Sequence, residues 1–314
     1  MSHEPHETFA PRAEASGPSA STASHTTVPL RPAMGSMEGS PGAVCPAPDP
    51  ATILDKGPAM FLSVDVGNTQ TTFGLIDDAG SVLQHWRTKT DKLDTADELA
   101  IRLTGLLAGR GFSMDVVDAV AVASVVPALQ RAWHVCLMRL GKDPLMVGAQ
   151  GPCPIEVALA YPSQVGADRI ANAVEAKELY GAPAIVVDFG TATNIDVVAP
   201  DGSFVGGVIA PGVMLGAQAL FDRASKLSST PIAMPPRVVG RDSEQALQSG
   251  IVIGAAAMAE GLVARIKAEL GVGECPVVAT GGLARTVSEA TDCFTAVDPD
   301  LTLRGIHRIW LAQA

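Results

Sequence analysis

The hydrophobic and polar positions of residues 60–314 form two similar series. In the first series, an apolar run ends at an aspartate, a short polar turn follows, and a second apolar run completes a predicted β-hairpin. A third strand, an amphipathic helix with leucines on one face, a buried strand, a second helix and a short strand come next. These elements are expected at 61–77, 82–88, 95–109, 119–123, 127–140 and 145–147.

The second series repeats this order after a linking helix that runs from about Asp168 to Tyr180. Two series in the same order favour a duplicated α/β domain over a chance likeness. We therefore place the halves at 60–180 and 181–314, with an insertion at 210–248. The hairpin, third strand, long helix, fourth strand and last helix of the second half are expected at 185–198, 204–209, 249–270, 276–279 and from 283 onward.

Residues 1–59 show no such periodicity and hold ten prolines among many Ser, Thr and Ala residues. This composition buries too little apolar surface to offset the entropy of ordering, so we predict a disordered tail. The tail has no basic start followed by an apolar stretch, which argues against a secretory signal. Met60 directly precedes the first predicted strand and is a candidate start site.

Both predicted hairpins turn at residues that suit phosphate binding. The first turn reads Asp65-Val66-Gly67-Asn68-Thr69, and the second reads Asp188-Phe189-Gly190-Thr191. Such a turn gathers backbone N–H groups and small polar side chains, and a carboxylate beside it suits the magnesium that accompanies a phosphate. A single copy could equally be an ordinary hairpin turn. Recurrence at the same place in both halves favours a pair of phosphate loops.

Composition narrows the classes of partner. The formal charge of −11, the lack of a Lys/Arg cluster and the 4% aromatic content argue against nucleic acid. The five cysteines form no C-x-x-C pair and are expected to be reduced, and the six histidines lack the spacing of zinc ligands. No apolar run approaches the length of a membrane span. We expect a cytoplasmic protein without a membrane partner.

Four stretches in this order resemble type III pantothenate kinases, a family of the actin-like ATPase and sugar-kinase superfamily: 60–69, 166–169, 188–193 and 206–212. The likeness covers nearly all of 60–314. It implies two actin-like, ribonuclease H-like α/β halves with a nucleotide cleft between them. The implied reaction is the ATP-dependent phosphorylation of pantothenate to 4'-phosphopantothenate, which is the first step of coenzyme A biosynthesis. Mg²⁺, a monovalent cation (K⁺ or NH₄⁺) and a homodimer with its active site near the subunit boundary are also implied.

The resemblance assigns roles to individual residues. Asp168 would be the general base on the primary hydroxyl of pantothenate, while positioning and charge neutralisation do most of the catalytic work. Arg169 would pair with the pantothenate carboxylate as a bidentate donor. Asp188 would ligate the monovalent cation, and Asp65 would lie toward magnesium. The implied ATP-binding residues are Asp65, Val66, Gly67, Asn68, Thr69, Gln70, Thr71, Thr72 and Thr191, and the implied pantothenate-binding residues are Gly166, Ala167, Asp168, Arg169 and Ser243.

The chain departs from the family pattern at three places. Leu159 occupies the position of a substrate-contacting Tyr in many members, and Tyr161 follows two residues later. Asp242-Ser243 replaces a frequent Asn-Thr pair but keeps the hydroxyl, and Asn194 stands where a second Thr is usual.

Two other functions fit the same scaffold at the level of sequence. One is a kinase for a different small molecule, such as a sugar, which a panel of phosphoryl acceptors would reveal. The other is a nucleotide-binding regulatory protein without metabolic turnover, whose use of ATP would not depend on an acceptor. The Gly-Ala-Asp-Arg stretch favours pantothenate over the first, and the lack of a basic DNA-reading element argues against the second.

Overall fold

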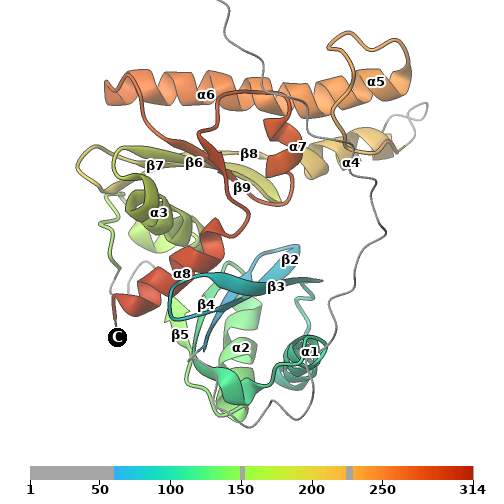
Figure 1. The fold of residues 1–314 in the computed structure, drawn as a ribbon. Coiled ribbons are helices and arrows are strands. Elements are labelled where there is room, and N and C mark those ends of the chain that lie inside the picture. Colours follow the sequence, from blue (N-terminus) through green and yellow to red (C-terminus); the bar gives the residue numbers. More distant parts are fainter. Residues whose placement is uncertain (1–59, 149–152, 224–228, 314) are drawn as a thin grey trace, which may run out of the picture. The chain divides into compact units, whose positions relative to one another are not determined.

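The computed structural model describes residues 60–148, 153–223 and 229–313, and the tail predicted at 1–59 lies outside them. Two five-stranded mixed sheets, one from each half of the sequence, form the framework (Figure 1). Helices cover the sheets, as an α/β architecture requires. The α/β fold with two similar halves that the sequence predicts is therefore confirmed, whereas the exact boundary at 180/181 stays a prediction.

The first sheet consists of β1 (Met60–Val66), β2 (Gln70–Ile76), β3 (Val82–Lys89), β4 (Val117–Ser124) and β5 (Leu145–Val147). Its strand order is β3-β2-β1-β4-β5. β1 pairs antiparallel with β2 and parallel with β4, so the first polar turn leaves the centre of the sheet. β1 is buried along almost its whole length, whereas β3 alternates between partly buried and exposed positions, which is the expected pattern of an edge strand with one solvated face.

The second sheet repeats this plan with β6 (Ala184–Phe189), β7 (Ala192–Val198), β8 (Phe204–Pro211), β9 (Val277–Thr280) and β10 (Ala296–Val297). Its strand order is β10-β9-β6-β7-β8. β6 pairs antiparallel with β7 and parallel with β9, as β1 does with β2 and β4. The second polar turn therefore occupies the same place in its sheet as the first.

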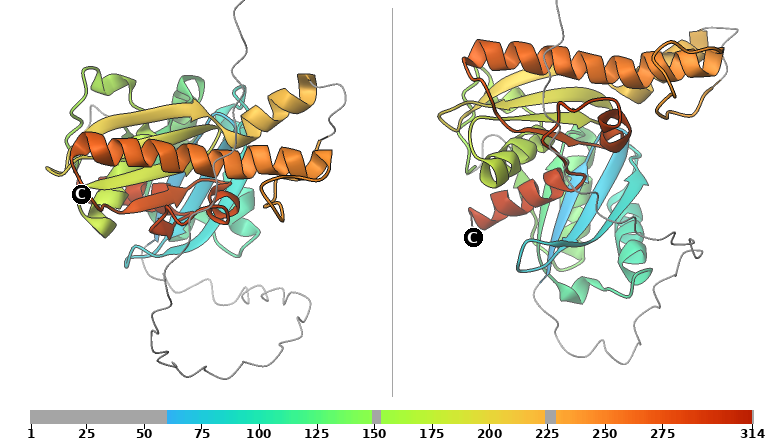
Figure 2. Two further views of the ribbon diagram at one scale, coloured as in Figure 1. Left: turned by 90° about the horizontal axis from the view of Figure 1, so that it is seen from above. Right: turned by 45° about the horizontal axis from the view of Figure 1, so that its top comes forward.

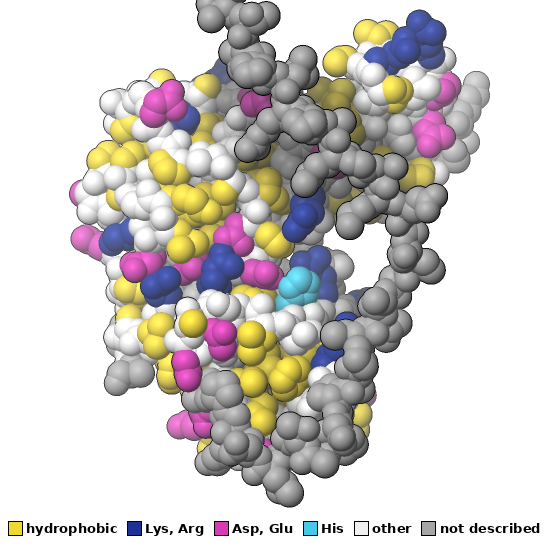
Figure 3. Space-filling view, in the orientation of Figure 1, with side chains coloured by type: hydrophobic (Ala, Val, Ile, Leu, Met, Phe, Trp, Pro, Cys, Tyr) yellow, Lys and Arg dark blue, Asp and Glu magenta, His cyan; other side chains and the backbone are white. Residues whose placement is uncertain are grey.

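Two helices, α3 (Ala167–Tyr180) and α8 (Leu301–Leu311), pack against each other between the sheets. Their close crossing requires glycine at 305, because a Cβ there would lie 2.0 Å from the carbonyl oxygen of Ala171. The buried Glu175 of α3 accepts hydrogen bonds from Arg304 Nε at 3.0 Å and Arg308 Nε at 2.7 Å. Basic and acidic side chains are interspersed in a band at the level of α8 (Figure 3). Packing and ion pairs together fix the end of the chain against the first sheet.

Other helices cover the outer faces of the sheets. On the first sheet, α1 (Ala96–Ala108) and α2 (Pro127–Arg139) share a core with β1 and β4 that includes Leu103 and Trp133. On the second sheet, a continuous helix covers the strands (Figure 2), and α7 (Ala284–Ser288) packs beside it. This helix comprises α5 (Ser243–Gln248), a π-helical turn at Ser249–Ile253 and α6 (Gly254–Leu270).

The helix at Ser243–Leu270 is more apolar than the sequence analysis allowed for. It has the length and the mean hydropathy, 1.5, of a candidate membrane span. Core helices of soluble enzymes meet the same criterion, and Ala256, Ala259 and Val263 of this helix are buried against the second sheet. Packing against the second sheet therefore accounts for the buried part of this helix, which is 39% of its most apolar window.

In the described ranges, the predicted strands and long helices are present, together with further elements. α4 (Val213–Arg223) and α5 lie inside the predicted insertion, and β10 and α8 follow the last predicted helix. The signal for α8 is in the sequence, because Leu303, Ile306 and Ile309 recur at helical spacing and are all buried.

Candidate active site

A cavity of about 750 Å³ opens between the polar turns of the two hairpins. This volume lies within the range of roughly 300–1,000 Å³ that is common for small-ligand sites. Its wall is formed by both turns, the beginning of α3, the glycine turn after β9 and the segment that leads into α8. The two halves of the duplicated fold thus contribute equivalent elements to one site.

The first turn presents polar groups to the cavity. Asn68, Thr69 and Gln70 are exposed there, and Gly67 N–H donates to the carbonyl of Gln70 at 3.0 Å. Gly67 leaves room for this tight turn, since a Cβ would lie 2.9 Å from the same carbonyl oxygen. Of the eight residues predicted between Asp65 and Thr72, six line the cavity.

The other two residues of that predicted loop, Val66 and Thr71, are buried instead. They are cross-strand partners in the β1–β2 hairpin and point together into the protein. Thr71 Oγ1 shares a 2.9 Å hydrogen bond with Thr90 Oγ1, which ties the hairpin to the end of β3.

The second turn meets the first across the cavity. Thr191, which the sequence analysis assigned to ATP binding, lines the cavity and is exposed. Its Oγ1 donates a 2.9 Å hydrogen bond to Thr69 Oγ1. This contact joins the two predicted phosphate loops directly.

Three aspartates reach the cavity from three elements: Asp65 near the end of β1, Asp188 near the end of β6 and Asp168 in the first turn of α3. Desolvation, followed by the nearby negative charges, raises the pKa of Asp65 well above its usual range and that of Asp188 to about 7. Desolvation also raises the pKa of Asp168, although the backbone N–H of Arg169 opposes this by donating to its Oδ1 at 2.8 Å. The site therefore favours the arrival of a proton or a cation.

Glycines leave space for two of these carboxylates. A Cβ on Gly166 would lie 2.3 Å from Asp168 Oδ1, and a Cβ on Gly281 would lie 2.3 Å from Asp188 Oδ1. Gly281 also has φ of +92°, a conformation that other residues rarely adopt. The glycine before Asp168 and the glycine turn after β9 are therefore explained by the carboxylates that lie against them.

Asn172 links Asp188 to the end of the chain. It is fully buried one turn after Asp168 in α3, and its Nδ2 lies 3.4 Å from Asp188 Oδ2. Its Oδ1 accepts a 2.7 Å hydrogen bond from Thr302 Oγ1, and Thr302 itself lines the cavity. The sequence analysis did not identify Asn172, although its i+4 spacing from Asp168 placed both side chains on one face of α3.

Arg169, Gly166 and Ala167 do not line the cavity, although they flank Asp168. Arg169 donates from Nε to Oδ1 of Asp196 at 2.6 Å, and Nη2 lies 2.6 Å from the same oxygen. The guanidinium carbon lies 5.7 Å from the ring centroid of Phe204, a cation–π distance. Asp196 is fully buried, and its Oδ2 has no hydrogen-bond partner in the structure. Arg169 is thus held by β7 and β8 beside Asp168.

Ser243 lies apart from these residues in the described chain. It is the exposed first residue of α5 and does not line the cavity. Asp242 before it caps the helix by accepting from Gln245 N–H at 2.8 Å. Its assignment to pantothenate binding remains a prediction.

The carboxylates at the cavity can be compared with the ligands that the implied cations need. In the described ranges, no group of three or more His, Cys, Asp or Glu side chains is arranged to hold a metal ion alone. Magnesium in kinases is bound by one or two carboxylates together with substrate phosphates. Asp65 beside the first turn fits that arrangement, and Asp188 beside the second turn offers a carboxylate to another cation.

Residues outside the predicted set also form the wall. Arg87 comes from β3, Thr280 and Gly282 come from the turn after β9, and Leu303 comes from α8. Alternation along β3 gave no reason to separate Arg87 from an ordinary solvent-facing arginine. The C-terminal residues come from an element that the sequence analysis did not predict.

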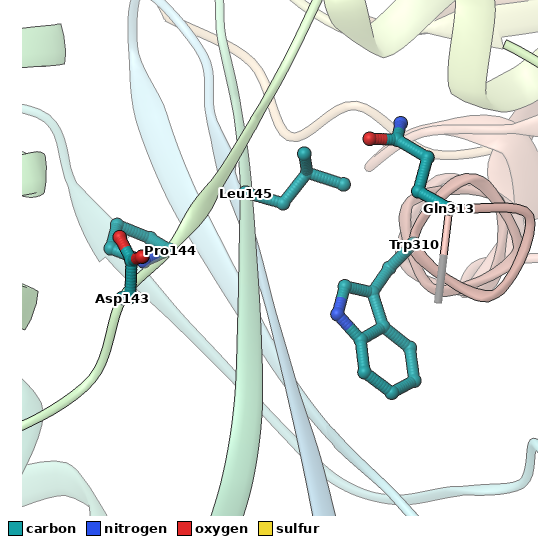
Figure 4. A pocket seen from close by; sticks show the side chains of 5 residues that line it. All are labelled: Asp143, Pro144, Leu145, Trp310 and Gln313. Carbon is teal, nitrogen blue, oxygen red and sulfur yellow. The ribbon is translucent and has the colours of Figure 1, made fainter. Parts of the chain in front are cut away.

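A smaller hollow of about 310 Å³ lies at the C-terminal end of α8 (Figure 4). Trp310 and Gln313 face Leu145 and its neighbours Asp143 and Pro144 there. It shares no lining residue with the cavity and gathers only one carboxylate, so it offers no comparable chemistry.

Comparisons with known proteins agree with this geometry. The family model for type III pantothenate kinase matches residues 61–265. A type III pantothenate kinase from Roseiflexus sp. (strain RS-1) is 41% identical over 252 residues, which cover 80% of this chain and 98% of the relative. One from Paramagnetospirillum magneticum is 45% identical over 253 residues and covers 80% of this chain and 96% of the relative.

Among solved structures, a chain from Campylobacter jejuni described as a Baf family transcriptional activator has a TM-score of 0.53 at 16% identity. The match covers 80% of this chain and 98% of that chain, and at this identity it shows the fold alone. The match covers 98% and 96% of these two relatives, and the cavity joins two polar turns and three carboxylates. The chain belongs to the type III pantothenate kinases, which phosphorylate pantothenate with ATP in the first step of coenzyme A biosynthesis.

Proposed function

We propose that ATP lies with its phosphates between the two polar turns and that pantothenate is presented to Asp168. The observation that carries this assignment is the meeting of the turns at Thr69 and Thr191, 2.9 Å apart, beside three carboxylates in one cavity. Small hydroxyls and backbone N–H groups grouped in this way suit phosphate oxygens. The remaining volume beside Asp168 is left for the acceptor.

Asp168 is the general base in this proposal. It accepts the proton of the primary hydroxyl while the hydroxyl oxygen forms a bond to the γ-phosphorus. The bond from that phosphorus to the β–γ bridging oxygen breaks, and ADP leaves with the electron pair. The desolvation that raises the pKa of Asp168 makes it a better proton acceptor than a solvated aspartate.

Asp65 and Asp188 hold cations in this proposal. Magnesium bound at Asp65 would neutralise phosphate charge and orient the γ-phosphoryl group. A potassium or ammonium ion at Asp188 would offset charge at the second turn. The raised pKa of both carboxylates supports this assignment, because a bound cation would relieve the repulsion among the three aspartates.

Arg169 binds the pantothenate carboxylate at the margin of the cavity. Asp196 engages Nε and Nη2 through one oxygen, and the other N–H groups of the fork remain for a second carboxylate. The contact with Phe204 and the bond to Asp196 hold the guanidinium against β7 and β8. In this proposal, Arg169 binds the substrate carboxylate and the neighbouring Asp168 accepts the proton, and different contacts hold the two side chains.

We also propose a cytoplasmic homodimer. Large apolar side chains are exposed on edge strand β8 and helix α4, and two from α4, Met214 and Leu215, also line the cavity. A second copy packed on this surface would cover apolar area and place a subunit boundary at the mouth of the site. The exposed members of this surface are Val205, Ile209, Met214, Leu215 and Leu220.

One experiment tests the core of the proposal. ADP release from purified full-length protein is measured with and without pantothenate, in potassium and in sodium buffers. We expect release to depend on pantothenate and to be faster in potassium. Release without an acceptor would favour a regulatory nucleotide-binding protein, and indifference to the cation would remove the role given to Asp188.

A further inference from the structure

Arg87 lines the cavity but has no role in the function proposed above. It is the one positively charged side chain among the described lining residues, and three carboxylates line the same cavity. It forms no hydrogen bond or ion pair with another described residue, whereas His85 on the same strand is paired with Asp300 at 3.1 Å. A guanidinium without a partner among the described residues, at the proposed phosphate site, is available to bind a ligand.

Strand register aims Arg87 into the site. Asp65 in β1 lies opposite Thr72 in β2, and Thr72 lies opposite Arg87 in β3. Directly opposed residues of neighbouring strands project from the same face, and all three of these residues line the cavity. Arg87 is therefore the third member of a row that begins with the proposed magnesium ligand.

The side chain also extends from the first sheet to the second half. Its Nη1 would lie 3.4 Å from a Cβ placed on Gly282, in the glycine turn after β9. Its charge lowers the pKa of Asp65 and of Asp188, although for both groups desolvation has the larger, opposite effect. The guanidinium is thus close enough to Asp65 and Asp188 to interact with a phosphate group that lies between them.

We propose that Arg87 is a catalytic residue that donates hydrogen bonds to the phosphoryl group in transfer. In the reaction the bond from the acceptor oxygen to the γ-phosphorus forms as the β–γ bridging bond breaks, and negative charge moves onto the β-phosphate of ADP. The planar guanidinium fork can contact a γ-phosphate oxygen and the oxygen that becomes anionic. This inference rests on the proposed function of the cavity and adds the group that stabilises its transition state.

The structural alternative is that Arg87 serves only as a counter-charge that keeps Asp65 and Asp188 folded into the cavity. That role would affect stability and the binding of ATP and cations. A role in the transition state would affect kcat while ATP binding and folding change little. The two interpretations therefore differ in what a substitution changes.

The test compares Arg87→Met and Arg87→Ala with Lys89→Met in the full-length protein. Lys89 lies two residues along β3 on the same side, is exposed and does not line the cavity, so its substitution removes the same charge. We expect kcat for pantothenate phosphorylation to fall by about 10²–10³ in the Arg87 variants, as when one transition-state donor is removed. The ATP Kd and the Tm should change little, and the Lys89 variant should match the wild type.

Free guanidinium at low millimolar concentration provides a second readout. It should restore part of the activity of Arg87→Ala in a saturable way and leave Arg87→Met unrestored, because only the alanine variant leaves room for it. Retention of kcat within about threefold in Arg87→Met would overturn the inference, as would a loss of activity that only follows lost folding or ATP binding and is not rescued. If the wild type itself shows no pantothenate-dependent ADP release, the proposed function fails first.

Discussion

At the scale of single residues, the site depends on partly buried carboxylates that lie against glycines. Gly166 and Gly281 supply the space against Asp168 and Asp188 that any side chain would fill. Desolvated carboxylates cost stability in the free protein, so their retention at one cavity indicates a function rather than a packing need. The first two predictions concern these side chains.

Asp168→Asn tests the general base. The amide keeps the shape and can still accept from the backbone N–H of Arg169, but it takes up no proton. Turnover should fall by about 10²–10⁴ while ATP binding and Tm stay near the wild-type values. The matched control is Asp97→Asn, another first-turn aspartate, which lies exposed on α1 and pairs with Arg139. A near-wild-type rate for Asp168→Asn would end the assignment.

Asp188→Asn tests the cation site through pH. The pKa of Asp188 in the folded protein, about 7, lies above the ordinary value of 3.8, so the folded protein holds the extra proton between these values. The contribution of Asp188 to the free energy of unfolding therefore falls as the pH rises from about 4 to about 7. Without magnesium, potassium or ammonium, the asparagine variant should gain in Tm relative to the wild type as the pH rises from 5 to 8.

The same variant should lose the potassium dependence of turnover. Thermal melts at pH 5, 6, 7 and 8, with and without potassium, measure the first effect, and initial rates in potassium and sodium measure the second. A constant Tm difference across the pH range would show that Asp188 does not titrate there.

At the scale of elements, α3 connects the proposed general base, Asp168, to α8 and the rest of the fold. Its first turn carries Asp168, its next turn carries Asn172, and its last turns are paired with α8 through Glu175. Glu175 is fully buried, while Arg304 and Arg308, which donate to it, are partly exposed. Solvent and salt therefore screen these ion pairs less than they screen surface pairs.

Glu175→Gln tests the junction of α3 and α8. Loss of the charge leaves two guanidinium groups with weaker acceptors and should lower the free energy of unfolding by about 1–3 kcal/mol. The control is Glu178→Gln on the same helix, because its side chain is 58% exposed and, among the described residues, its ion pair is with Arg308 at 3.3 Å. Chemical denaturation of both variants gives the comparison. Equal effects would mean that burial of Glu175 does not set the strength of the pair.

Ser243→Ala tests the insertion. The substitution leaves the Asp242 cap of α5 intact and removes only an exposed hydroxyl. If Ser243 contacts pantothenate, as the resemblance implies, the KM for pantothenate should rise while that for ATP stays nearly unchanged. Asp242→Ala should instead lower stability by about 1 kcal/mol, through loss of the cap. A change of both KM values in Ser243→Ala would place the residue elsewhere.

The helices and strands were easier to predict than the side chains that line the cavity. The hairpins and long helices follow from periodicity, and the turns at Gly67 and Gly190 follow from turn chemistry. Arg87 and Thr302 were not found, because their roles arise only when strand register or a distant helix brings them to the cavity. A local pattern carries no information about such partners.

At the scale of the whole molecule, the duplicated halves create one site because equivalent turns meet at Thr69 and Thr191. The family model matches 61–265, and relatives that are covered over 98% of their own length match 80% of this chain. The reaction of the family is therefore carried by the part of the sequence that follows the predicted tail.

A protein that begins at Met60 should match the full chain in kcat and Tm. The backbone nitrogen of Met60 already donates to Asp118 Oδ2 at 3.0 Å, and as a new terminal ammonium it would keep that partner as a charge pair. A protein that begins after Val66 should not fold, because it lacks β1, which pairs with both β2 and β4 at the centre of the first sheet. Melting curves and pantothenate-dependent ADP release compare the three proteins. A large loss of either property in the protein that begins at Met60 would show that residues 1–59 contribute to the enzyme, against the prediction from their composition.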